Sequence, residues 1–433
     1  MFKNYFKTAW RNLVKSKAHS IINIAGLSVG MAVAMLIGLW MWDELSFNKY
    51  HQNYDRIAQV MQQRINNGTI NTTPAIPEPL APAFQKDYGG DFKHIVMASW
   101  TESHLLSVAD KKISYPGDFM GAEGPEMFTL TMLKGTRNGL SDPSSMLISS
   151  SIANALFGSD DPLGKMIQLD NTASFKVTGV YEDLPKNTSL HNLAFIAPWD
   201  YYVASRDWVK NAINNWDENS FQMYVQLSAN ADVEKVSSKI KDIILKNVNN
   251  EEAKYKPLIL LQPMRKWHLY SEFKNGINTG GAIEYVWMFG IIGIFVLLLA
   301  CINFMNLSTA RSEKRAKEVG IRKAIGSLRI QLMNQFFCES LLMAAMAFCV
   351  ALILVQLALP LFNELSDKNM SVLWTNPFFW MICILFALFT GIIAGVYPAL
   401  YLSSFKPVKI LKGTFRAGRL ASVPRKVLVT IQF

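Results

Sequence analysis

The densest run of basic side chains in the sequence lies between Asn303 and Ser340, and an apolar stretch flanks it on each side. Its cations are Arg311, Lys314, Arg315, Lys317, Arg322, Lys323 and Arg329, and its acids are Glu313 and Glu318. Apolar positions recur among them at helical spacing: Ile321, Ala324, Ile325, Leu328 and Leu332. A basic amphipathic helix of this kind can lie on lipid headgroups, or it can dock into a groove on a cytoplasmic partner. Gly320 and Gly326 predict a bend or a short break within it.

Two other stretches contain the residue types of catalytic motifs, but their context does not fit. The stretch Gly26-Leu27-Ser28-Val29-Gly30 has the GxSxG spacing of serine hydrolases, which requires a strand, a sharp turn and a helix. It lies instead in a long apolar run. The stretch Gly158–Lys165 is similar to a phosphate-binding loop, but it has five residues between its glycines and Met166 where Ser or Thr is needed. We therefore expect no enzymatic activity, no ATPase module and no directly bound cofactor.

The net charge of +10 is concentrated in short segments beside the apolar runs. Three short segments, 1–20, 303–335 and 403–426, together hold nineteen Lys or Arg residues and two acidic residues. The long segment 43–282 holds twenty-three Lys or Arg residues and twenty-seven acidic residues. Nucleic-acid binding would place the excess on one folded domain, while the cytoplasmic flanks of membrane spans carry it for topological reasons. We expect a multi-pass membrane protein with a cytoplasmic N-terminus and no nucleic-acid partner. The cysteines and histidines show no metal-site spacing, so no metal site is predicted.

The apolar runs predict four transmembrane helices, each long enough to cross a hydrocarbon core of ~30 Å. The predicted spans are residues 21–42, 283–307, 336–359 and 377–402. The predicted segments outside the spans are a cytoplasmic amphipathic helix at 1–20, an extracytoplasmic domain at 43–282, a cytoplasmic loop at 308–335, a short outer loop at 360–376, and a basic linker with the start of a truncated further span at 403–433.

Small and polar residues within the spans predict contacts between helices. Small side chains repeat every four residues in the first span, at Gly26, Gly30, Ala34 and Gly38, and a shorter version in the fourth has Gly391 and Gly395. Such stripes favour close helix packing. Asn303 and Asn306 are expected to hydrogen-bond across helices, and Glu339 is expected to pair with a base such as Arg329 rather than to mark an ion pathway.

The segment 43–282 has no apolar run long enough to span a membrane. Apolar and polar residues alternate in it at 57–65, 94–100 and 105–115, as they do in β-strands. A short helix is predicted at 78–88, and another at 232–247 with Asp232 as its cap. These patterns predict an α+β domain of two subdomains. The predicted fold class is thus an α-helical membrane protein with four transmembrane helices, plus an α+β extracytoplasmic domain inserted between helices 1 and 2.

The sequence KEVGIRKAIGS, with Glu339 in the next span, resembles the cytoplasmic loop of MacB/FtsX-type ABC transporter permeases. The matching residues are Glu318, Val319, Gly320, Ile321, Arg322, Lys323, Ala324 and Gly326. The segment 146–192 is similar to the extracytoplasmic core of MacB-type permeases, with a helix at Ser149–Phe157, strands at Met166–Leu169 and Phe175–Val180, and a turn at 185–187. Residues 119–135 match less sharply, and YPALYL followed by FKPVKILKG is similar to the family's exit from the last helix.

This resemblance implies a bacterial inner-membrane permease that works with a separate cytoplasmic ABC ATPase, the source of its ATP. The matching loop would be the coupling helix that rests on that ATPase. Motion would reach the extracytoplasmic domain through an unbroken helix from Tyr285 to Ala316. The implied partners are a second permease half or a second copy, membrane lipids, and a periplasmic adaptor with an outer-membrane channel. The implied function is export or extraction of peptides, including antimicrobial ones, lipoproteins or hydrophobic compounds.

Two further interpretations accompany the resemblance. The alternative function is that of a non-transporting FtsX-like regulator or sensor, which controls a periplasmic partner such as a cell-wall hydrolase through the same coupling helix. The resemblance is also closest to permeases in which the whole unit occurs twice, so we interpret this sequence as the first half of such a chain or as a truncated copy.

Overall fold

The computed structural model describes residues 2–310, 312–404 and 430, and the chain divides into two units. One unit combines residues 1–42 with residues 286–433 and is helical. The other comprises Asp43–Tyr285 and contains the sheets. The predicted linker and truncated span at 403–433 lie outside the described residues except for 403, 404 and 430.

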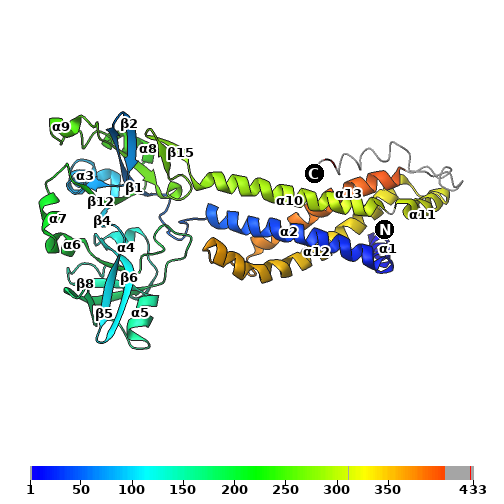
Figure 1. The fold of residues 1–433 in the computed structure, drawn as a ribbon, viewed down its shortest axis with the longest axis horizontal. Coiled ribbons are helices and arrows are strands. Elements are labelled where there is room, and N and C mark those ends of the chain that lie inside the picture. The colour runs from blue at the N-terminus through cyan, green and yellow to red at the C-terminus, as the bar shows by residue number, and fades with distance from the viewer. Residues whose placement is uncertain (1, 311, 405–429, 431–433) are drawn as a thin grey trace. The chain divides into compact units, whose positions relative to one another are not determined.

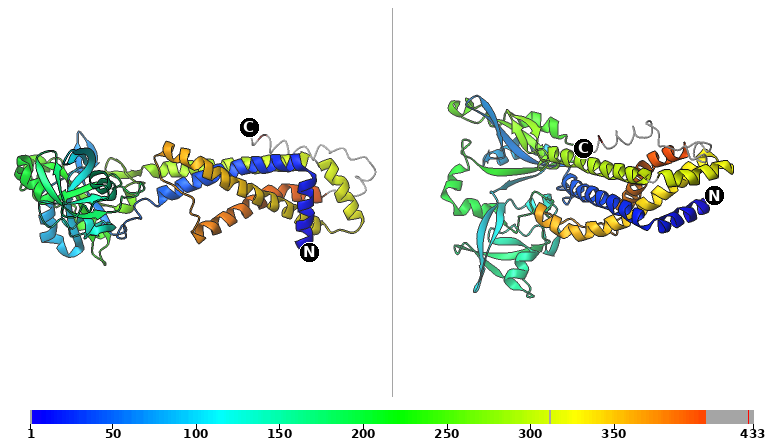
Figure 2. Two further views of the ribbon diagram at one scale, coloured as in Figure 1. Left: turned by 90° about the horizontal axis from the view of Figure 1, so that it is seen from below. Right: turned by 45° about the vertical axis from the view of Figure 1, so that its right-hand side comes forward.

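The helical unit contains six helices among the described residues (Figure 1): α1 (Phe2–Lys15), α2 (Lys17–Leu45), α10 (Ala282–Ala310), α11 (Ser312–Ala324), α12 (Arg329–Ser366) and α13 (Pro377–Ser403). Four of them, α2, α10, α12 and α13, are long and apolar enough to cross a membrane. They lie side by side, whereas α1 turns away from the direction of α2 (Figure 2). Four candidate membrane helices were predicted, and this part of the fold class is confirmed.

Helix α12 begins earlier and ends later than the apolar run at 336–359 suggests. It starts at Arg329, so its first turns belong to the predicted loop, and it continues through Pro360 to Ser366. The predicted outer loop at 360–376 is therefore partly helical. Proline lacks one backbone donor and ordinarily kinks or ends a helix, but the helix continues here to Asp367, which takes a left-handed conformation at φ 50°.

The other unit is built mainly from strands, with short helices between them. Its strands are β1 (Ile57–Asn66), β2 (Thr69–Thr73), β3 (Ile76–Pro77), β4 (Phe92–Ala98), β5 (Glu102–Val108), β6 (Lys111–Met120), β7 (Met132–Gly135), β8 (Ser145–Ser149), β9 (Met166–Leu169), β10 (Ala173–Tyr181), β11 (Phe195–Pro198), β12 (Asn219–Leu227), β13 (Leu258–Pro263), β14 (Glu272–Lys274) and β15 (Ile277–Gly280). Its α-helices are α3 (Leu80–Tyr88), α4 (Gly124–Met127), α5 (Ser150–Phe157), α6 (Trp199–Ser205), α7 (Asp207–Ala212), α8 (Val233–Ile240) and α9 (Asn250–Ala253).

Thirteen of these strands form one sheet, in the order β11-β8-β10-β9-β5-β6-β4-β12-β1-β13 with β2, β3 and β7 paired at its sides. The two halves of the sheet meet where β4 pairs with β6, and this register has a single residue pair, Ala98 with Met120. Two backbone bonds of 2.9 Å flank it, from Ser99 N to Phe119 O and from Gly121 N to Met97 O. We call this narrow join the seam. Hydrogen bonding across the seam joins the two halves in one sheet, and the division into two subdomains stays a prediction.

Local signals in this domain work as predicted at helix starts. Ser149 caps α5, since its side chain accepts a hydrogen bond from Ile152 N, and Asp232 caps α8 by accepting one from Lys235 N. The helix predicted over 232–247 is shorter, because α8 ends at Ile240 and turns follow. Ile243 and Ile244 are nevertheless buried in the main hydrophobic core of the domain, so their helical spacing marked burial rather than a continuous helix.

Candidate functional site: the segment between α10 and α12

Helix α11 carries most of the residues that match the coupling helix, and its buried side packs on the N-terminal end of α12 and the C-terminal end of α13. Val319 is buried in a cluster with Leu332 and Phe336 of α12 and with Ala399 and Leu402 of α13. Gly320 is also buried, and it lies inside α11 without interrupting the helix. The cluster holds α11 against two candidate membrane helices.

Hydrogen bonds reinforce this packing on the polar side. Glu318 pairs with Arg322 one turn later at 2.7 Å, and Arg322 also donates to Gln335 of α12. Lys323 Nζ donates to the Ser403 carbonyl at 2.6 Å, at the C-terminal end of α13. Desolvation lowers the pKa of Lys323, and the charge of Arg329 lowers it further. The segment is therefore held to α12 and α13 by directional contacts as well as by apolar packing.

Gly326 ends α11 in a conformation that other residues rarely adopt. Its φ is +100°, and its N–H donates to Lys323 O at 3.0 Å while the N–H of Ser327 donates to Arg322 O at 3.0 Å. These two bonds form a Schellman motif, which satisfies the last carbonyls of a helix and reverses the chain. Of the two glycines predicted to interrupt the segment, only Gly326 does so.

The outer side of the segment exposes apolar side chains to solvent. Ile321, Ile325, Leu328 and Ile330 are 50%, 81%, 62% and 61% exposed. Ala324 is exposed beside them. We call these five residues the docking patch. Leu332, predicted for the same stripe, is 2% exposed and belongs to the buried cluster instead. Lys317 and Arg329 are also exposed, so an apolar surface with a basic rim faces away from the bundle.

The predicted small-residue stripe of α2 contacts α10 over part of its length. A Cβ on Gly30 would overlap the Cβ of Ala300, and one on Gly26 would lie 3.5 Å from Asn303 Nδ2. Ala34 packs against the core of the bundle. Gly38, in contrast, has nothing within 4 Å of its Cβ position, so it makes no close helix contact.

The stripe of α13 packs against α12. A Cβ on Gly391 would lie 2.9 Å from Leu341 Cδ2, and one on Gly395 would lie 2.9 Å from Ser340 Cβ. Both glycines therefore occupy positions where a larger residue would push the two helices apart.

The two asparagines of the second predicted span lie differently from the prediction. Within the described part of the chain, Asn306 Oδ1 is buried with no hydrogen-bond partner, and no hydrogen bond joins Asn303 to another helix. Glu339 is 3% exposed and lies beside Ser308 and Pro398. Arg329, the example given for its basic partner, donates to Ser403 Oγ at 3.4 Å, and the pairing of Glu339 with a base stays a prediction.

A second cluster, which sequence reasoning missed, joins the first and last residues of the Asp43–Tyr285 domain. Glu44 is 4% exposed and pairs with His268 Nε2 at 2.5 Å, and Phe47 stacks on the His268 ring with 3.7 Å between ring centres. Glu44 directly follows the first apolar run, and His268 precedes the second. This ion pair therefore joins the two chain segments that enter and leave the domain.

Asn48 and His51 extend this junction into the interior of the domain. Asn48 has φ +66°, and its side chain accepts from Ser189 N at 2.7 Å and donates to Met264 O at 3.2 Å. His51 is fully buried, with Nδ1 donating to Phe128 O at 2.6 Å and Nε2 at 2.8 Å from Thr188 Oγ1. Burial lowers the pKa of His51. No local pattern marks these residues, since their partners lie 77 to 216 positions away.

Comparison with known proteins identifies the family. The profile of the MacB-like periplasmic core domain matches residues 20–243, which is more than half of the chain, and that of the FtsX-like permease C-terminal domain matches residues 290–407. The chain belongs to the MacB/FtsX family. Its α/β domain of periplasmic type is inserted between the first and second candidate membrane helices, as predicted for the fold class.

Relatives of two lengths resemble this chain. YvrN, an uncharacterized ABC transporter permease of Bacillus subtilis, is 22% identical over 94% of this chain and 99% of its own length. The macrolide export ATP-binding/permease protein MacB of Haemophilus ducreyi is 25% identical over 73% of this chain and 42% of its own length. The chain thus spans nearly all of YvrN but less than half of MacB.

Among solved structures, the periplasmic region of MacB from Actinobacillus actinomycetemcomitans matches at a TM-score of 0.34 and 16% identity, covering 46% of this chain and 87% of that one. The extracellular domain of the Gram-positive transporter YknZ matches at the same score and identity, covering 48% of this chain and 99% of that one.

Proposed function

We propose that this chain is the permease subunit of an ABC transporter and that the docking patch is the surface on which a separate ATPase subunit acts. The relatives support the first part, since one that matches over nearly its whole length is named an ABC transporter permease. The single observation that supports the second is the exposed apolar patch of Ile321, Ala324, Ile325, Leu328 and Ile330 on a segment fixed to α12 and α13.

The composition of the patch fits a protein partner better than a headgroup surface alone. Ile325 is 81% exposed at the C-terminal end of α11, and leaving such a side chain in water is unfavourable by about 1.5–3 kcal/mol relative to burying it. Four large exposed apolar side chains near the exposed Lys317 and Arg329 in the chain have the composition of an interface, which combines apolar and charged residues.

In the proposed orientation, the docking patch and α1 face the cytoplasm, and Asp43–Tyr285 lies outside it. The distribution of Lys and Arg supports this orientation, because positive loops stay on the cytoplasmic side. Helix α1 fits an interfacial position: Phe6, Trp10 and Val14 are about half exposed along one stripe, with Lys7 and Arg11 between them.

ATP-driven motion would pass along α10 to the extracytoplasmic domain, whose junction residues Glu44 and His268 keep its two ends together. Helix α10 has 29 residues, or about 43 Å at 1.5 Å per residue, which makes it a stiff element without proline. The predicted continuation to Ala316 crosses Arg311, which lies outside the described residues. The substrates proposed are exported or extracted peptides, lipoproteins or hydrophobic compounds, handled outside the membrane.

The test is a charge placed in the centre of the patch. Ile325→Asp should weaken co-purification of the cognate ATPase roughly tenfold or more, because interface anchors typically contribute 2 kcal/mol or more. The matched control is Ile277→Asp on β15, which makes the same change at a position that is 70% exposed in the other unit. Unchanged co-purification and transport in the Ile325→Asp variant would contradict the proposal, and equal loss in both variants would show that the patch has no special role.

A further inference from the structure

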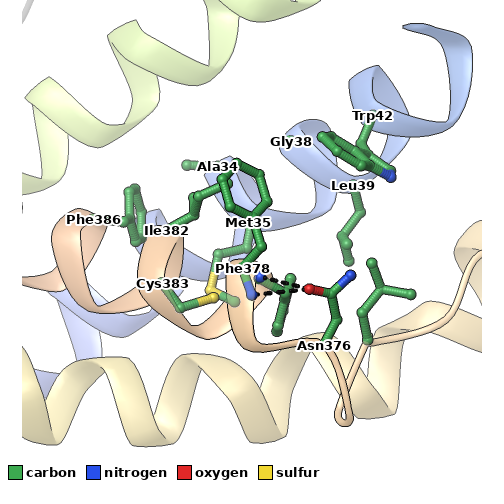
Figure 3. Close-up of a pocket in the computed structure, with 12 residues that line it drawn as sticks. Ala34, Met35, Gly38, Leu39, Trp42, Asn376, Phe378, Ile382, Cys383 and Phe386 are labelled. Atoms are coloured by element: carbon green, nitrogen blue, oxygen red, sulfur yellow. Dashed lines mark hydrogen bonds between the residues drawn. The ribbon is translucent and has the colours of Figure 1, made fainter. Parts of the chain in front are cut away.

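An apolar groove lies between α2 and α13, close to the end of α2 that leads into Asp43 (Figure 3). Its volume is about 200 Å³. Ala34, Gly38 and Trp42 line it from α2, and Ile382 and Phe386 line it from α13. Gly38 explains why the groove is open, because nothing lies within 4 Å of its Cβ position and it has no side chain to fill the space. The last member of the small-residue stripe thus borders a groove and not a neighbouring helix.

The groove has the depth of one leaflet. From Trp42 to Ala34 the helix rises about 12 Å, and from Asn376 to Phe386 the chain rises about 15 Å, at 1.5 Å per residue. The hydrocarbon core of a bilayer is ~30 Å thick, so the groove reaches from one interface to near the midplane. A helix with its side chains is about 10 Å across, which is too wide for a space of this volume over this length.

The groove is also polar at one end only. Figure 3 shows Trp42 and Asn376 near one end and Phe386 at the other. Asn376 Oδ1 caps α13 by accepting from Phe378 N at 2.9 Å and from Phe379 N at 3.3 Å, which leaves its Nδ2 group available. Among the described residues, neither Asn376 Nδ2 nor Trp42 Nε1 has a hydrogen-bond partner. Two donors therefore stand at the mouth of an otherwise apolar groove, which is the polarity of an amphiphile.

We propose that this groove binds one acyl chain of a membrane phospholipid from the leaflet on the Asp43 side, with the ester region at Trp42 and Asn376. The groove selects a flexible hydrocarbon chain by its depth and width, and it orients the chain by the two donors at its mouth. The inference depends on α2 and α13 spanning a membrane and on nothing about the ATPase. It can therefore hold or fail independently of the proposed function.

The experiment uses the whole chain in vesicles of phosphatidylethanolamine and phosphatidylglycerol, with a phosphatidylcholine probe that carries a diazirine on one acyl chain. After irradiation, mass spectrometry locates the lipid adducts on peptides. A Cβ at Gly38 meets nothing within 4 Å, so Gly38→Leu is expected to fold with its side chain in the groove. The control Ala25→Leu makes a similar change at an exposed position of α2 about 13 residues away, or ~20 Å.

The proposal predicts adducts on residues 34–42 and 376–386 that fall about tenfold in Gly38→Leu, equivalent to about 1.4 kcal/mol, and persist in Ala25→Leu. Adducts spread evenly over all four helices, or unchanged by Gly38→Leu, would overturn it. A third contradicting result would be that native mass spectrometry shows fewer dimers of Gly38→Leu while the lipid adducts remain. The groove would then be a contact surface for a second copy of the chain.

Discussion

Replacing Asp118 with asparagine should remove a pH-dependent destabilisation of the extracytoplasmic domain. Asp118 lies on β6, two residues before the seam, where it is 1% exposed and its Oδ1 atom has no hydrogen-bond partner among the described residues. Burial raises the pKa of Asp118 from 3.8 to about 7, while a hydrogen bond from Thr101 opposes the shift. The folded domain therefore holds a proton on Asp118 that the unfolded chain releases near pH 4.

The sign of the effect follows from this order of pKa values. Below about pH 4 the Asp118 carboxyl is protonated in both the folded and the unfolded chain, so the free energy of unfolding has its full value there. As the pH rises towards 7, the unfolded chain is already ionised while the fold still resists ionisation, so the free energy of unfolding decreases. One pKa unit is worth about 1.36 kcal/mol, so a shift from 3.8 to about 7 corresponds to on the order of 4 kcal/mol lost across that window.

The assay is urea unfolding of the whole chain in detergent micelles, followed by tryptophan fluorescence at several pH values between about 4 and 8. Asp118→Asn keeps the side-chain shape without the charge. It should match the wild type near pH 4 and exceed its free energy of unfolding by a few kcal/mol above pH 7. The control Asp110→Asn changes an exposed carboxylate at the turn before β6 and should not alter the pH dependence. A constant difference between Asp118→Asn and the wild type at all pH values would refute the reasoning.

Three further predictions concern packing and backbone conformation. Gly30→Leu should destabilise the helical unit by about 1–3 kcal/mol in thermal unfolding, because it overlaps Ala300, and a stability equal to wild type would contradict the α2–α10 contact. Asn48→Ala should cost about 2 kcal/mol or more in urea unfolding, since buried partners lose their bonds and φ +66° disfavours alanine; a loss below about 0.5 kcal/mol would argue against the junction. Gly326→Ala should cost about 1 kcal/mol and reduce transport-coupled ATP hydrolysis, because φ +100° suits glycine, and unaltered coupling would count against a fixed break there.

Hydropathy and periodicity were sufficient to predict the four candidate membrane helices and the strands β1, β4, β5 and β6, because both depend on neighbouring residues. The strand predicted at 57–65 is β1, and that at 94–100 overlaps β4. The segment 105–115 folds into the β5–β6 hairpin. The ends of α12 were predicted less well. Hydropathy shows where the apolar residues end, whereas the helix ends where its backbone hydrogen bonds end, with Asp367 as the C-cap.

The remaining features depend on partners that are distant in the sequence. The seam between Ala98 and Met120, the pair of Glu44 and His268, and the bonds of Asn48 arise from register and topology, which a single sequence does not specify. The stripe from Gly26 to Gly38 predicted helix packing along its whole length. Whether each glycine meets a neighbour depends on how the helices cross, and Gly38 borders a groove instead.

In the segment between α10 and α12, spacing predicted a helix but did not separate its two faces. Val319 and Leu332 turn inwards because the ends of α12 and α13 lie there, while Ile321 and Ile325 remain exposed. This division made Ile325 the better test position. Gly320 is buried, so an aspartate at that position would disturb folding.

The central claim is that the exposed side of this segment contacts an ATPase inside the cell, and site-specific cross-linking tests it most directly. A benzophenone amino acid in place of Ile325 should, on irradiation of intact cells, form an adduct with the cognate ATPase, whereas the same group in place of Ile277 should not. Adducts of the Ile325 position with lipid alone, or labelling of a cysteine there by a membrane-impermeant reagent added outside the cells, would contradict the account.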